Sequence, residues 1–274
     1  MRKIKYPLVV SDFDGTLVRS DGTISEFTKK TLAEYIQNGG KFAISTGRMP
    51  AGILHRAKEL DLKGVVCCGQ GTAIVDIETN EVVSTGVIET ETAVKICKKM
   101  EEMGLHIHVY DLWDFYSNMD DEPLKLYESI VKCKATVIDK EPISEWVQRT
   151  GLRTFKVLAM VRPEDATSVL SELKNADFEN CVVTRSSEFL IEVNTSKYSK
   201  GTAVSFLANR YGAELEHTIA VGDQLNDLSM LKTAGLGFAV KNADEEIKKE
   251  AKVFPFTNDE DAVARIIEQY AYEG

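Results

Sequence analysis

Short apolar runs alternate with stretches of helical periodicity at both ends of the chain, and this alternation restricts the possible folds more than any other feature. The expected strands lie at 8–10, 42–44, 65–67, 218–221, 237–240 and 253–254. Between them stand helix signals such as an N-cap serine, Ser25, and a proline in a first helical turn, Pro50. Repeated strand–helix–strand units predict right-handed crossovers and a parallel sheet covered by helices on both faces.

A different pattern fills the middle of the chain. Strands at 73–77 and 82–85 flank a turn and predict a hairpin. Beyond it we expect helices at 91–103, 123–131 and 163–174, and strands at 105–110, 114–117, 155–161, 181–184 and 188–193. Antiparallel strands with helices on one side indicate an α+β insert. The chain is therefore expected to form a Rossmann-like α/β core, residues 1–86 and 187–274, interrupted by an α+β domain at 87–186.

Charge and cysteine content narrow the classes of partner. Asp and Glu number 43 against 33 Lys and Arg, which gives a net charge of −10. Such a chain is a poor candidate for nucleic-acid or acidic membrane surfaces, because both require basic protein surface. The five cysteines form no Cys-x-x-Cys pair, which indicates a reducing compartment. We expect a soluble cytoplasmic protein, a monomer or a weak homo-oligomer, with no nucleic-acid or membrane partner.

Two acidic loops follow expected strands directly. They are residues 12–16, DFDGT, and residues 222–227, GDQLND. Aspartate and glycine are common in strand-ending turns and at helix N-caps, so each loop alone has a structural explanation. Ligands of parallel sheets bind beyond the carboxyl ends of the strands, however, and both loops are expected at that edge.

Gathering these carboxylates at one edge requires a cation. At about 4 Å and an effective dielectric constant near 20, each pair of like charges costs on the order of 4 kcal/mol. Oxygen ligands of this kind favour Mg²⁺. The acidic loops therefore predict a magnesium site.

Groups that could bind an anion accompany the acidic loops. Residues 45–48, STGR, place hydroxyls, backbone N–H groups and a guanidinium at another strand end, where an anion would bind. Lys200 opens a helix just after the insert; by itself it would be interpreted as a solvated surface lysine. Carboxylates with a metal, a hydroxyl and a lysine together are typical of a phosphoryl-transfer site.

With these residues in place, the chain resembles the haloacid-dehalogenase-like phosphohydrolase superfamily, and within it the Cof-type sugar-phosphatase branch. Four motifs match in order, and they are Asp12-x-Asp14-Gly15-Thr16, Thr46-Gly47-Arg48, Lys200 and Gly222-Asp223-x-x-Asn226-Asp227. The resemblance covers the whole chain and implies that the insert is a cap domain that sets substrate specificity. It implies a Mg²⁺-dependent phosphatase that hydrolyses a small phosphorylated metabolite, either a sugar phosphate or a phosphorylated cofactor.

The resemblance also implies roles for individual residues. Asp12 would be the nucleophile that becomes an aspartyl-phosphate, and Asp14 the general acid and base. The phosphoryl oxygens would be held by Thr46, Gly47, Lys200 and Asn226. The metal would be held by Asp12, the backbone carbonyl of Asp14, and Asp223, with Asp227 adjacent.

The two roles require different environments for the paired carboxyl groups. A free aspartic acid is a poor proton donor at neutral pH, so we expect Asp14 to be buried beside other carboxylates. Asp12 must stay ionised to attack, which the metal and Lys200 would favour.

Three features leave alternatives open. Gln70-Gly71-Thr72 stands where branch members usually have Asn-Gly-Ala, which puts the function of that asparagine in doubt. A hexose phosphomutase would share this chemistry, although its glycine-and-arginine cap motif is not recognisable; a non-catalytic regulatory protein could share the fold. His106 and His108 share one face of a strand, and a metal pair there is disfavoured because no third ligand is evident.

Overall fold

The computed structural model describes residues 2–131 and 133–273, which divide into two compact units. The first contains the chain up to Gly47, residues 54–83, and the chain from Tyr198 onward. The second contains Arg48–Ile53 and Ser84–Lys197. We describe each unit by itself.

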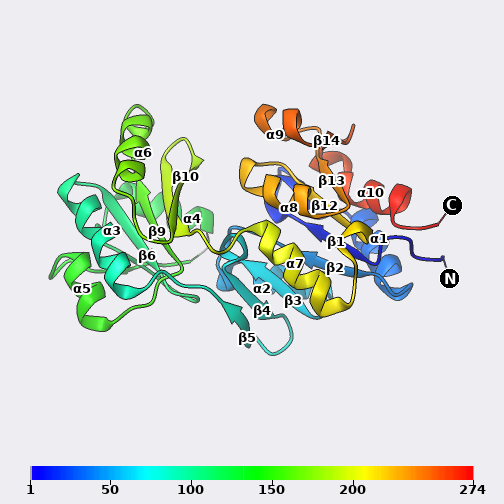
Figure 1. Cartoon of the computed structure of the whole chain (residues 1–274), viewed down its shortest axis with the longest axis horizontal. Helices are drawn as coiled ribbons and strands as arrows, with labels where there is room; N and C mark the ends of the chain where they lie inside the picture. Colours follow the sequence, from blue (N-terminus) through cyan, green and yellow to red (C-terminus); the bar gives the residue numbers. More distant parts are fainter. Residues whose placement is uncertain (1, 132, 274) are drawn as a thin grey trace. The chain divides into compact units, whose positions relative to one another are not determined.

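A parallel sheet is the centre of the first unit (Figure 1). Its strands are β1 (Leu8–Ser11), β2 (Lys41–Ile44), β12 (Thr218–Gly222), β13 (Leu236–Ala239) and β14 (Lys252–Val253). They run in the order β14-β13-β12-β1-β2. All residues of β1 and β12 are buried, as expected for strands covered on both faces. The parallel sheet predicted from the alternation is confirmed.

The helices of this unit connect and cover the strands. They are α1 (Glu26–Gln37), the part of α2 (Pro50–Glu59) from Leu54 onward, α7 (Lys200–Tyr211), α8 (Leu228–Thr233), α9 (Glu245–Glu250) and α10 (Ala262–Tyr270). Helix α1 packs on α10, and α7 packs on α8. Because the chain leaves β1 towards β2 but leaves β12 towards β13, right-handed crossovers place α1 and α8 on opposite faces.

The third expected strand of the parallel sheet pairs differently. The strands β3 (Val65–Cys68), β4 (Ala73–Asp76) and β5 (Val82–Thr85) form a small separate sheet, in which β3 and β4 are antiparallel. An isolated bridge between Ser45 and Cys67 joins β3 in parallel to the segment after β2. The chain turns back after β3 at Gly69–Gly71, and the neighbouring strands β4 and β5 form the predicted hairpin.

The second unit is an α+β domain with a six-stranded sheet in the order β10-β11-β9-β6-β7-β8. The strands are β6 (His106–Tyr110), β7 (Phe115–Ser117), β8 (Thr136–Val137), β9 (Lys156–Met160), β10 (Cys181–Ser187) and β11 (Leu190–Thr195). Its helices are α3 (Thr90–Glu102), α4 (Glu122–Val131), α5 (Ile143–Thr150) and α6 (Ala166–Asn175). The predicted fold class, a Rossmann-like core with an inserted α+β domain, is confirmed.

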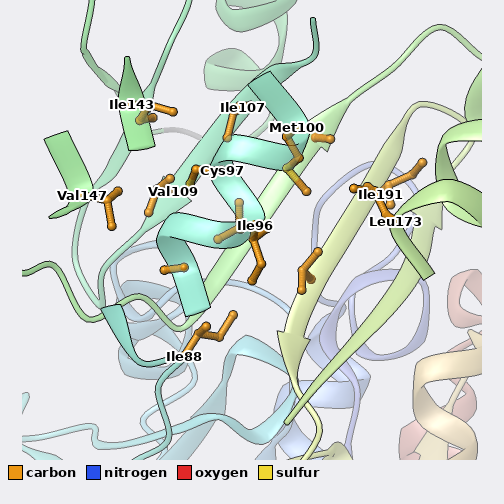
Figure 2. Close-up of a cluster of buried hydrophobic side chains, with 14 of the residues drawn as sticks. Ile88, Ile96, Cys97, Met100, Ile107, Val109, Ile143, Val147, Leu173 and Ile191 are labelled. Carbon is orange, nitrogen blue, oxygen red and sulfur yellow. The ribbon is translucent and has the colours of Figure 1, made fainter. Parts of the chain in front are cut away.

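One face of this sheet carries the hydrophobic core of the second unit. Figure 2 shows Ile96, Cys97 and Met100 of α3 close to Ile107 and Val109 of β6. The cluster extends to Ile143 and Val147 of α5, Leu173 of α6 and Ile191 of β11. Because β strands alternate, the opposite face presents His106, His108 and Tyr110 of β6.

The domain boundary differs from the sequence expectation at its carboxyl end. The second unit continues to Lys197 instead of ending at residue 186. The reason is that β11 pairs antiparallel with both β9 and β10, so a boundary at 186 would divide a hairpin. Two elements were not expected at all, namely β8 and α5.

Two further observations concern the cysteines and the helices. The five cysteines all lie among the described residues and are free thiols. In the described part of the chain, no helix combines the length and apolar character needed to cross a membrane.

Candidate active site

The two acidic loops meet where the direction of the sheet connections reverses. Strands β1 and β12 are parallel neighbours, with Ser11 opposite Val221. Asp12 follows β1 directly, and Asp223 follows β12 directly, so both emerge at the carboxyl edge. After β1 the chain continues to β2, which lies on one side of the β1–β12 pair. After β12 it continues to β13, which lies on the other side of that pair. Such a topological switch point is the usual ligand site of an open α/β sheet.

Lys200 is buried between two carboxylates. Its Nζ lies 2.6 Å from Asp12 Oδ1 and 2.5 Å from Asp227 Oδ1, and its side chain is 1% exposed. Ser199 caps helix α7 by accepting a hydrogen bond from the Thr202 N–H, which fixes Lys200 as the first helical residue. The interpretation as a solvated surface lysine is therefore wrong.

Asp227 uses both of its carboxylate oxygens for contacts within the protein. Oδ1 binds Lys200, and Oδ2 accepts the backbone N–H groups of Asp223 (2.8 Å) and Gln224 (2.9 Å). The side chain is completely buried. Asp227 therefore orients the lysine and the turn that carries Asp223.

The first acidic loop is shaped to receive Asp223. The Thr16 hydroxyl donates a hydrogen bond to Asp223 Oδ1 at 2.6 Å. Gly15 has φ +73°, and a Cβ there would lie 2.5 Å from Asp223 Oδ2. The Asp-Gly-Thr part of the motif thus combines a left-handed turn, room for a carboxylate and a donor that orients it.

The electrostatics of this cluster fit a bound cation. One oxygen from each of Asp12, Asp223 and Asp227 lies within 4.8 Å of the others, and all three residues are buried. Burial and the Asp227 charge raise the pKa of Asp12, and they outweigh Lys200, which lowers it. Burial also raises the pKa of Asp223. Ionising these carboxyl groups together is costly, because they are buried and close to one another. A hard divalent cation would offset that cost and prefers oxygen ligands of this kind.

The loop after β2 reaches the same edge of the sheet. Strand β2 pairs in parallel with β1, and Thr46 is buried. The N–H groups of Ser45 and Thr46 are engaged by the carbonyls of Ser11 and Cys67, both at 2.9 Å. These two backbone donors are thus used within the fold.

Three other residues of the predicted motifs are Asn226, Asp14 and Arg48. Asn226 is exposed, and its amide donates to Gln70 Oε1 at 3.0 Å. Asp14 is exposed, so the expectation that it is buried among carboxylates is wrong. Arg48 belongs to the second unit, where its guanidinium donates to the Gly52 carbonyl at 3.2 Å.

Three residues that shape the site had no assigned role in the sequence analysis. Thr16 lies within a recognised motif, and the motif could have indicated a role for its hydroxyl. The signal for Gln70 was its departure from the Asn-Gly-Ala pattern. Asn242 holds the first acidic loop by donating to the Gly15 carbonyl at 2.8 Å, and nothing in its local sequence marks it.

Comparisons with known proteins agree with this geometry. The family of haloacid dehalogenase-like hydrolases matches residues 9–267. A Haemophilus influenzae protein, provisionally named a phosphatase, is 32% identical over 96% of this chain and 98% of its own length. A Bacillus subtilis 5-amino-6-(5-phospho-D-ribitylamino)uracil phosphatase is 29% identical, over 97% of this chain and 96% of its own. The solved structure of a haloacid dehalogenase-like hydrolase from Bacteroides thetaiotaomicron superposes with a TM-score of 0.84 at 30% identity and covers 97% of this chain and 99% of its own.

Proposed function

The chain belongs to the haloacid dehalogenase-like hydrolase family, in its Cof-type branch, and is a phosphoric monoester hydrolase; on that premise we propose that it is a Mg²⁺-dependent phosphatase acting through an aspartyl-phosphate. The observation that carries the proposal is the buried ion-pair bridge from Lys200 to Asp12 and Asp227 at the switch point of the sheet. A nucleophilic carboxylate held beside a fixed cation suits attack on an anionic phosphate ester.

In the first step, an Asp12 carboxylate oxygen attacks phosphorus, and the bond from phosphorus to the leaving oxygen breaks. Asp14 protonates the departing alkoxide; its exposed position leaves the carboxyl group accessible to a substrate. In the second step, Asp14 takes a proton from water, the water oxygen attacks phosphorus, and the Asp12–phosphate bond breaks. The carboxylate of Asp12 is regenerated with release of inorganic phosphate.

Asp12, the Asp14 carbonyl and Asp223 would hold Mg²⁺, and Asp227 would stand beside them. When bound, the ion supplies positive charge that stabilises the phosphoryl oxygens in the transition state. Thr16 orients Asp223 for this role through its short hydrogen bond. Thr46, Gly47, Lys200 and Asn226 would hold the phosphoryl group, and Lys200 would keep Asp12 ionised.

The substrate is proposed to be a small cytosolic phosphomonoester, either a sugar phosphate or a phosphorylated cofactor. The activity named for the Bacillus subtilis relative, on a phosphorylated ribityl compound, belongs to this class. We propose that the second unit is the cap that sets the choice among such substrates.

The test is phosphate release from p-nitrophenyl phosphate and from a panel of sugar, nucleotide and cofactor phosphates, with Mg²⁺ and with EDTA. We expect Mg²⁺-dependent turnover that Asp12→Asn abolishes. Isomerisation of a hexose 1-phosphate with a bisphosphate activator, without phosphate release, would instead show a phosphomutase. If no substrate turned over faster than with the Asp12→Asn control, a non-catalytic role would be favoured.

A further inference from the structure

The turn after β3 contains a residue in an unfavourable backbone conformation. Gln70 has φ +62° and ψ 30°, in the left-handed region. Glycine adopts this region freely and asparagine is several-fold enriched there, whereas other side chains are uncommon. A glutamine at this position therefore has a conformational cost that a glycine would avoid, which indicates that its side chain contributes something in return.

The side chain of Gln70 contacts two of the loops that form the site. Its Oε1 accepts a hydrogen bond from the Asn226 amide at 3.0 Å. Its Nε2 lies over Gly47, where a Cβ would approach it to 2.6 Å. Its backbone N–H donates to the Thr46 carbonyl at 3.0 Å. One residue thus joins the loop after β2 to the loop after β12.

We propose that Gln70 is a positioning residue that fixes the Asn226 amide and the Thr46–Gly47 turn for the phosphoryl group. The inference rests on the proposed function, which assigns Thr46, Gly47 and Asn226 to the phosphoryl oxygens. In this chain, the length of glutamine allows its amide to contact both Asn226 and Gly47. Asparagine would suit the left-handed backbone better, but it is one methylene shorter and would withdraw its amide from Asn226 and Gly47.

The variant that tests this role is Gln70→Gly, which relieves the backbone and removes the side chain. Because phosphoryl contacts matter most in the transition state, we expect kcat to fall about tenfold with KM changed less than about threefold. The loss should be the same for p-nitrophenyl phosphate and for a hexose phosphate, since the phosphoryl group is common to both. The unfolding temperature should not fall. Gln70→Asn should show the same loss.

The matched control is Asp61→Gly, since Asp61 is exposed and also has a positive φ, of 50°. It should leave kcat and KM unchanged. An Asn226→Ala variant completes a double-mutant cycle: if the hydrogen bond carries the effect, adding Gln70→Gly to Asn226→Ala should lower kcat less than about threefold.

Three results would overturn the inference. They are an unchanged kcat in Gln70→Gly, full activity in Gln70→Asn, and a loss seen with one ester only, which would indicate contact with the leaving group. Failure of the proposed function would be recognised separately, since wild type would then release no phosphate. Calorimetric titration with orthovanadate, which mimics the trigonal-bipyramidal transition state, supplies a readout that needs no turnover: Gln70→Gly should weaken its binding, and unchanged affinity would be a fourth result against the inference.

Discussion

Asp12 is the proposed nucleophile, and its surroundings disfavour the ionised carboxylate that would attack. Burial and Asp227 raise its pKa, so the ionised form is disfavoured in the protein without metal. We predict that Asp12→Asn lowers kcat at least about 1,000-fold while raising the unfolding midpoint by about 2–4 °C in EDTA, equivalent to about 1 kcal/mol. Phosphate release and differential scanning calorimetry would measure the two effects. A lower midpoint would show instead that the ion pair with Lys200 dominates the stability of the site.

Thr16 gives a second prediction for a single residue. Its hydroxyl orients Asp223, so Thr16→Val should raise the Mg²⁺ concentration needed for half-maximal activity about 10–100-fold and leave the fold intact. Activity measured across a Mg²⁺ titration would show the shift. The control is Thr28→Val, since the buried Thr28 hydroxyl bonds Asp261 (3.2 Å) instead of a proposed metal ligand. Equal Mg²⁺ requirements in the two variants would exclude the orienting role.

The positions of the site residues could be predicted from sequence to the extent that strand ends determine them. Asp12 and Asp223 each follow an apolar strand, and the adjacency of those strands brings them together. The exposure of Asp14 and the backbone contacts of Asp227 depend on the path of each loop, which residue type does not specify. For the same reason, the link from Gln70 to Asn226 could not be derived, because it joins residues 156 positions apart in the chain.

Among the elements, the strands of the two main sheets other than β8 were predictable, whereas β8 and the helix α5 were not. The whole of β8 is two residues long and has no sequence pattern of its own. Helix α5 buries Ile143 and Val147, a spacing of four residues that is a helical signal, but eight residues give it little weight. The late boundary of the second unit results from the pairing of β11 with β9, a long-range contact.

Strand β6 carries a pH-sensitive pair of residues in the second unit. His106 and His108 are buried with their Nε2 atoms 3.1 Å apart, and His106 also contacts Ser117 Oγ (2.8 Å) and Asp121 Oδ2 (3.2 Å). Within the described residues, the histidines gather no compact group of three metal-ligating side chains. Burial, helped by His106 and Lys156, lowers the pKa of His108 to about 3. The pair is therefore buried in its neutral form.

Acid should destabilise the second unit through His108. Because the folded pKa lies below the unfolded value of about 6.5, the stabilising contribution is complete above pH 6.5 and is lost as pH falls towards 3. Between pH 7 and 5 this residue should account for a loss of about 2 kcal/mol in the free energy of unfolding. His108→Gln should reduce that loss, measured by urea unfolding at both pH values. The exposed His217 supplies the control, and a His217→Gln variant that abolished the acid sensitivity equally would contradict the assignment.

At the scale of the whole molecule, the acidic surplus has two functions. Most of the 43 acidic residues lie outside the site and contribute to the net charge of −10. Three of them, Asp12, Asp223 and Asp227, are buried at one sheet edge and are partly neutralised by a single lysine. Net charge alone could not distinguish the two groups, since only the order of the strands brings the three together.

The two units should respond to different solution conditions, because each is compact by itself and, among the described residues, the carboxylate cluster lies in the first. We predict that Mg²⁺ raises the unfolding temperature of the first unit alone. With a dissociation constant near 1 mM, about 10 mM Mg²⁺ would add about 1.4 kcal/mol, or about 3–5 °C. Differential scanning calorimetry after EDTA treatment would resolve the two transitions. Mild acid should lower the midpoint of the second unit but not that of the first, because the raised pKa values of Asp12 and Asp223 make acid stabilising there. Asp223→Ala removes a proposed ligand and should abolish the Mg²⁺ shift while the acid shift persists. An unchanged Mg²⁺ shift in Asp223→Ala would place the cation elsewhere in the molecule.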